Sequence, residues 1–101
     1  MITEIVYLNR DNTNDVLLKA DGSAQDLSAV TRMTLELDST TIDSDTSPDA
    51  FDWDTGTTGK LVLALGGESI TAGEYTAKLT VYDPDNDDGI FWGYIKLVVK
   101  E

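Results

Sequence analysis

The chain has 101 residues, the size of one domain, and its 19 acidic and seven basic residues give a net charge of −12. It contains neither histidine nor cysteine, which removes the commonest catalytic base, disulfides and thiolate metal sites. Seven basic side chains are too few to neutralise the phosphates along a nucleic acid, and the acidic excess repels them, so nucleic acid and anionic membranes are poor partners.

The first residues do not have the pattern of a signal peptide. Glu4, Arg10 and Asp11 interrupt the stretch in which an apolar signal core would lie. The other apolar-leaning stretches are about ten residues long and contain charges, far short of the length that crosses a membrane. We therefore expect a soluble protein made in the cytoplasm.

Alternating apolar and polar residues predict short strands along the whole chain. The first half holds three such segments, over residues 2–8, 16–20 and 30–37. Asp21-Gly22 predicts a turn between the second and the third. Residues 38–50 are polar and rich in turn formers, so we expect turns there, with at most a short strand near 40–43.

The second half continues the same pattern. Residues 51–54 predict a short edge strand, and Trp53 within it is expected to anchor the core. Further strands are predicted over residues 60–65, 74–83 and 90–100. The connection at 66–73 has room for one helical turn, and the acidic stretch 83–89 predicts a loop. No longer helical period of apolar residues occurs.

The last two strands form a predicted hairpin whose side chains separate onto two faces. The residues expected to face the core are Tyr75, Ala77, Leu79, Val81, Phe91, Ile95, Leu97 and Val99. The opposite face then presents Tyr82, Trp92, Tyr94 and Val98. An aromatic stripe of this kind suits a partner interface, because large rigid rings favour interfaces. One alternative is that a long loop covers this face, and another is that cross-strand aromatic pairs only stabilise the hairpin.

About seven short strands at regular spacing predict an all-β domain over residues 1–101. The expected architecture is an immunoglobulin-like antiparallel β-sandwich, because a single sheet would leave one face uncovered. Without histidine or cysteine, and with lysines that lie within strand patterns, we expect no enzyme and no catalytic residue.

The acidic loop raises the question of calcium. Asp83, Asp85 and Asp87 have the spacing that opens an EF-hand loop. The sixth position is Asp88 instead of glycine, and the twelfth is Tyr94 instead of glutamate. A solvated hairpin loop is therefore expected, with weak calcium binding as the alternative, and no cofactor. The aspartates between residues 43 and 54 are interpreted in the same way.

Several short motifs resemble those of a known family. The segments LKADG (18–22) and DLS (26–28), followed by a strand, resemble the opening of phage baseplate upper protein N-terminal domains. The later segments GKLVL (59–63) and ITAGEYTA (70–77) are similar to elements of immunoglobulin-like phage structural domains. The resemblance spans most of the chain but its motifs are short, and residues 38–56 are more acidic than the family pattern.

The resemblance implies a phage or prophage structural protein of the tail, baseplate or capsid surface, located in the virion. Its partners would be other virion proteins or copies of itself. The net charge of −12 opposes self-association, so the isolated domain is expected to be a monomer. The resemblance implies no cofactor. The alternative is a carbohydrate- or cell-surface-binding sandwich that uses Trp53, Trp92 or Tyr94, with weak Ca²⁺ binding.

Overall fold

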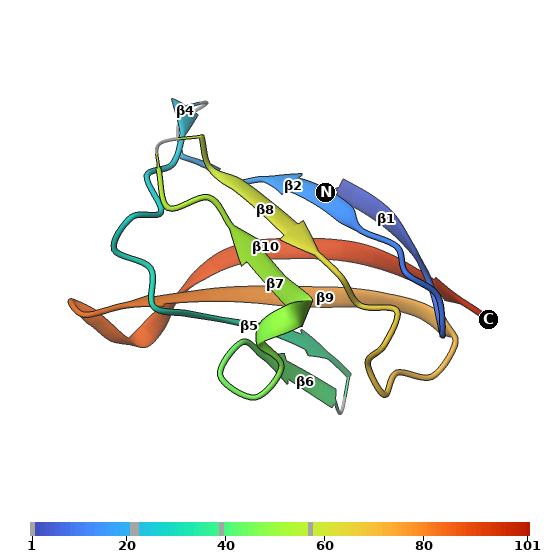
Figure 1. Cartoon of the computed structure of the whole chain (residues 1–101). Coiled ribbons are helices and arrows are strands. Elements are labelled where there is room, and N and C mark those ends of the chain that lie inside the picture. Colours follow the sequence, from blue (N-terminus) through green and yellow to red (C-terminus); the bar gives the residue numbers. More distant parts are fainter. Residues whose placement is uncertain (1, 21–22, 39, 57) are drawn as a thin grey trace.

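The computed structural model describes residues 2–20, 23–38, 40–56 and 58–101. They form an all-β protein with two main sheets (Figure 1). The larger sheet has the strand order β1 (Ile2–Tyr7), β10 (Asn86–Lys100), β9 (Gly73–Asp83), β5 (Arg32–Leu37), β6 (Thr40–Asp43). The smaller has the order β2 (Asn14–Leu17), β8 (Lys60–Leu63), β7 (Phe51–Trp53).

Three short elements complete the described chain. Strands β3 (Lys19–Ala20) and β4 (Ser23–Ala24) form a small separate hairpin. A single 3₁₀ turn, η1 (Pro48–Ala50), leads into β7. The described residues contain no helix long and apolar enough to cross a membrane.

Both main sheets contribute to one hydrophobic core, an arrangement compatible with a β-sandwich. The larger sheet supplies alternate residues of its central strands, and the smaller sheet supplies alternate residues of β2 and β8. Fully buried members from the two sheets are Val6, Met33, Leu35, Leu61, Leu63 and Leu97. The period-two pattern of the sequence therefore selects the buried face of each strand.

The predicted strands are confirmed in most places, including the short strand at Thr40–Asp43 and the edge strand at Phe51–Trp53. Trp53 packs partly buried against the core, as expected. The predicted turn at Asp21-Gly22 lies outside the described residues. The helical turn expected within 66–73 is absent from that segment, and the 3₁₀ turn lies at Pro48–Ala50 instead.

Two features of the predicted sheet are wrong. The sheet is mixed, because β1 runs parallel to β10, with Val6 beside Val99. Alternation fixes which face a side chain occupies but carries no information on strand direction, so the sequence could not reveal this pairing. The loop expected over 83–89 is also shorter, because β10 already begins at Asn86.

The β9–β10 hairpin is regular in one half and irregular in the other. From Gly93 to Val99, β10 pairs residue for residue with β9, and the register shifts between Asn86 and Ile90 and again between Phe91 and Gly93. The first shift adds two residues to β10 and so keeps its side chains on the same faces, whereas the second adds one residue and moves the alternation to the opposite face. Leu79, Leu97 and Val99 are buried as predicted.

Candidate protein-binding face

The structure separates the four residues of the predicted aromatic stripe. Tyr94 is 52% exposed, whereas Tyr82, Trp92 and Val98 are half-buried. Trp92 packs against the core, so its predicted outward position is wrong. The four residues therefore do not form one continuous exposed stripe.

The bulge between Phe91 and Gly93 explains the difference. Phe91 is paired with Thr80 and is 51% exposed, although the alternation predicted it in the core. Trp92 is the additional residue of the bulge and turns toward the core in its place. Sequence alternation assigns both rings to the wrong face because it assumes an unbroken register.

Phe91 and Tyr94 form an exposed aromatic pair. Their ring centroids are 5.1 Å apart and their planes meet at 63°, an edge-to-face arrangement. The Lys78 ammonium lies 5.5 Å from the centroid of the Phe91 ring, within cation–π distance. Lys78 and Tyr94 are direct partners across β9 and β10. This cluster therefore combines two exposed rings with a positive charge.

A second exposed apolar group lies on β1 at the other end of the same sheet face. Ile5 and Tyr7 are each 43% exposed, and they pair with Val98 and Lys100 of β10. Sequence reasoning missed both residues. The signal was the consecutive apolar run at residues 5–8, which places large side chains on both faces of one strand.

Together these residues define the front face, the outward face of β1, β10 and β9. Its charged residues are three lysines, Lys78, Lys96 and Lys100, against Glu74, and the exposed Glu36 of the adjacent β5 is the direct partner of Lys78. The Lys96 ammonium lies 3.2 Å from the Glu74 carboxylate. The front face is thus locally positive in a chain of net charge −12. Its apolar members are Ile5, Tyr7, Phe91, Tyr94 and Val98.

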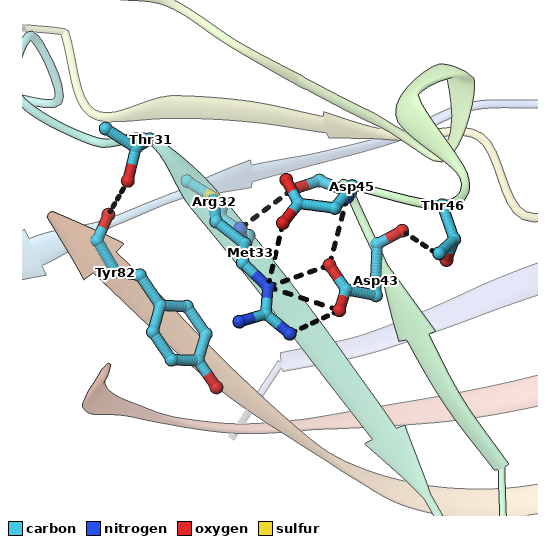
Figure 2. A network of polar contacts seen from close by, with 8 residues as sticks. Thr31, Arg32, Met33, Asp43, Asp45, Thr46 and Tyr82 are labelled. Atoms are coloured by element: carbon cyan, nitrogen blue, oxygen red, sulfur yellow. Dashed lines mark hydrogen bonds and ion pairs between the residues drawn. The ribbon is translucent and has the colours of Figure 1, made fainter. Parts of the chain in front are cut away.

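Tyr82 is engaged in a polar network on the neighbouring strands (Figure 2). The Arg32 guanidinium lies 4.6 Å from the centroid of the Tyr82 ring. Its Nε donates hydrogen bonds of 2.9 and 3.1 Å to the two carboxylate oxygens of Asp43. These hydrogen bonds lower the pKa of Asp43 and raise that of Arg32. Arg32 thereby covers one face of the Tyr82 ring and joins β5 to β6.

The carboxylate of Asp83 is already used by the hairpin turn. Its Oδ1 accepts hydrogen bonds of 2.9 Å from the Asp85 backbone N–H and from the Asn86 side-chain amide. This is an Asx-type turn, which matches the expectation of a turn-forming loop. The side chain of Asp87 lies outside the part of the chain that the structure describes. Among the described side chains, no group of three carboxylates has a metal-binding arrangement.

Two hollows are candidate binding sites for a small molecule. A groove of about 260 Å³ lies beside the bulge and is lined by Leu17, Leu18, Trp92, Tyr94 and their neighbours. A polar hollow of about 560 Å³ is lined by Arg10, Asp49, Glu68 and adjacent loop residues. Neither lining contains a nucleophile beside a general base, which an acyl-transfer or hydrolytic site of the triad type needs.

Comparison with known proteins adds no identification. No protein-family model matches the chain, and no curated protein matches it. The front face therefore has to be interpreted from its own residues.

Proposed function

We propose that the chain is a non-catalytic assembly module that binds another protein through the front face. The observation that carries this proposal is the exposed pair of Phe91 and Tyr94 on a sheet face that also exposes Ile5 and Tyr7. Clusters of exposed aromatic and aliphatic side chains on a small domain mark contact surfaces.

An immunoglobulin-like topology is part of the proposal, and the strand order supports it. The larger sheet places the last strand, β10, beside β9 and then β5 and β6, while the smaller sheet has the order β2-β8-β7. These orders correspond to the G-F-C-C′ and B-E-D sheets of a variable-type immunoglobulin sandwich, with β1 as an additional strand beside G. Such sandwiches commonly act as binding scaffolds.

The proposed setting is the virion of a phage or prophage, in a tail, baseplate or capsid-surface structure. This part rests on the resemblance of the motifs at residues 18–28 and 59–77 to phage structural domains. The absence of histidine and cysteine from the sequence supports a contact role over catalysis.

A carbohydrate-binding module is the second candidate and has less support. Flat sugar rings stack on exposed aromatic faces, but Trp53 and Trp92 both pack partly buried against the core. Phe91 and Tyr94 are exposed but meet at 63°, so they do not form one flat platform. Titration with a panel of glycans should therefore leave the intrinsic tryptophan fluorescence unchanged.

The proposal is tested by capture of virion proteins on the immobilised chain. Tyr94→Lys and Phe91→Lys should fold normally, because both side chains are half-exposed, and should lose the virion proteins that the wild type retains. Ser69→Lys, in an exposed connection away from the front face, is the matched control and should retain them. Wild-type capture by both folded front-face variants would contradict the proposal.

A further inference from the structure

The smaller sheet also has an outward face, and its chemistry is opposite to that of the front face. Asp15 of β2 and Asp52 of β7 both pair with Val62 of β8, so two carboxylates flank one aliphatic side chain. Leu17, which is 53% exposed, pairs with Lys60 on the same two strands. These five residues define the back face.

The back face combines apolar groups with negative charge. Asp15 and Asp52 are both exposed, and Val62 is half-buried between them. Adjacent strands are about 4.8 Å apart, so the two aspartates lie about 10 Å apart across three strands. With two aspartates against one lysine, the back face is locally negative, whereas the front face has three lysines against Glu74 and the neighbouring Glu36 of β5.

The two faces are also comparable in spacing. Lys78 is the direct partner of Tyr94, and Lys96 lies two residues further along β10. Diagonal neighbours of this kind are about 7–8 Å apart, and long lysine side chains reach further still. A pair of lysines on the front face can therefore meet the pair of aspartates on the back face of another molecule, with Tyr94 against Val62 or Leu17.

We propose that the partner of the front face is the back face of a second copy of this chain. The two faces belong to different sheets and adjoin at the groove that Leu17 and Tyr94 line. A front-to-back contact joins two different surfaces, so it is heterologous and leaves a free face on each molecule. Copies then stack front to back in a row, and the row continues as long as the rotation between neighbours does not close a ring. This inference rests on the proposed contact function and specifies its partner.

The net charge of −12 sets the conditions under which stacking occurs. At roughly 0.01 M salt the screening length is about 30 Å, so whole molecules repel one another and the chain remains a monomer. Near physiological salt the length falls to about 8 Å, which screens the distant charges more than the ion pairs in contact. Association should therefore be strongest at intermediate salt and weaken again toward about 1 M, where the ion pairs are also screened.

Sedimentation equilibrium of the full chain tests the stacking directly. Over protein concentrations from about 10 µM to about 1 mM, the wild type should change from monomer to dimers and larger species at physiological salt. Asp15→Lys/Asp52→Lys should weaken this association at least tenfold, although it reduces the net charge from −12 to −8 and thereby the general repulsion. Asp11→Lys/Asp88→Lys makes the same charge change at exposed positions on neither face and should associate at least as well as the wild type.

A second variant, in which two front-face lysines are replaced by glutamates, tests the other side of the contact. Lys78→Glu/Lys96→Glu should also associate more weakly than the wild type, and mixing it with the back-face variant should restore association, because each then offers a complementary face to the other. Thermal unfolding verifies that each variant is folded. If Asp15→Lys/Asp52→Lys is not folded, Asp15→Asn/Asp52→Asn replaces it, and a partial loss of association is expected.

Two outcomes would overturn the stacking. A wild type that stays monomeric at about 1 mM would show that the partner is not a second copy, and unchanged association of the back-face variant would show that the back face does not take part in the contact. In both cases, loss of virion-protein capture by Tyr94→Lys would still support the proposed function. Retained capture by the folded Tyr94→Lys and Phe91→Lys variants would contradict that function independently.

Discussion

The two halves of the β9–β10 hairpin differ in how well the sequence describes them. In the half from Gly93 to Val99, the pairing is regular and every second side chain of β10 enters the core. In the irregular half, from Asn86 to Gly93, the one-residue shift after Phe91 changes the faces, and Phe91 lies outside although the alternation places it inside. Alternation is thus a reliable guide only as long as the register is continuous.

The comparison also shows how a binding surface arises from an irregular strand. The bulge exchanges two large rings, so that Trp92 fills the core edge and Phe91 becomes available beside Tyr94. Bulges are over-represented next to functional sites because they redirect a side chain without changing the fold. The regular half supplies stability, and the irregular half supplies the exposed aromatic pair.

The largest expected difference between the two halves is in the effect of truncating side chains. Leu97→Ala should lower the free energy of unfolding by about 2–5 kcal/mol, because it leaves a cavity in the buried, regular half. Phe91→Ala in the tip should cost less than about 1 kcal/mol, because half of the ring is already exposed. Chemical denaturation measures both values, and equal costs would show that Phe91 belongs to the core.

A smaller effect is expected from a backbone change in the tip. Gly89 has φ of 86°, and an added Cβ would lie 2.5 Å from Thr80 Cγ2. Gly89→Ala should therefore cost about 1–3 kcal/mol through left-handed strain, and the contact adds to it. Gly67→Ala is the control, because no atom lies within 4 Å of its added Cβ. Equal melting temperatures for the two variants would contradict the left-handed conformation of Gly89 and its close approach to Thr80.

The ion pair beside the tip gives a smaller, pH-dependent effect. The hydrogen bonds from Arg32 lower the pKa of Asp43. The ionised Asp43 therefore contributes to the free energy of unfolding at every pH above the ordinary carboxylate pKa. The contribution is lost as the pH falls through the depressed value, below about pH 4. Asp43→Asn should thus lower stability at neutral pH by less than about 1 kcal/mol. Its difference from the wild type should shrink in acid, and a constant difference would contradict the ionic origin.

The smallest expected effect is that of calcium on the turn of the hairpin. Since Asp83 Oδ1 already accepts two hydrogen bonds within the turn, the fold should not depend on a metal ion. Excess chelator should leave the melting temperature unchanged, and millimolar-range Ca²⁺ should raise it only slightly through weak binding and screening. A rise of many degrees at about micromolar Ca²⁺ would instead support a calcium-dependent binding module.

Much of the fold and part of the candidate face could be predicted from the sequence. The alternation located β5, β8 and β9 within a few residues, and it placed Leu79 and Leu97 in the core. It also selected Tyr94 as an exposed aromatic residue. It missed Ile5 and Tyr7, because a consecutive apolar run does not reveal which of its members faces solvent.

What the sequence determined by itself is the strand period, the all-β class, the acidic character and the lack of histidine and cysteine, because each depends only on local residue type. The tertiary structure decided the parallel pairing of β1 with β10 and the exchange of Phe91 and Trp92. It also decided the separation of lysines and aspartates onto different faces. These features depend on strand order, direction and register, which are set by contacts between residues far apart in the chain.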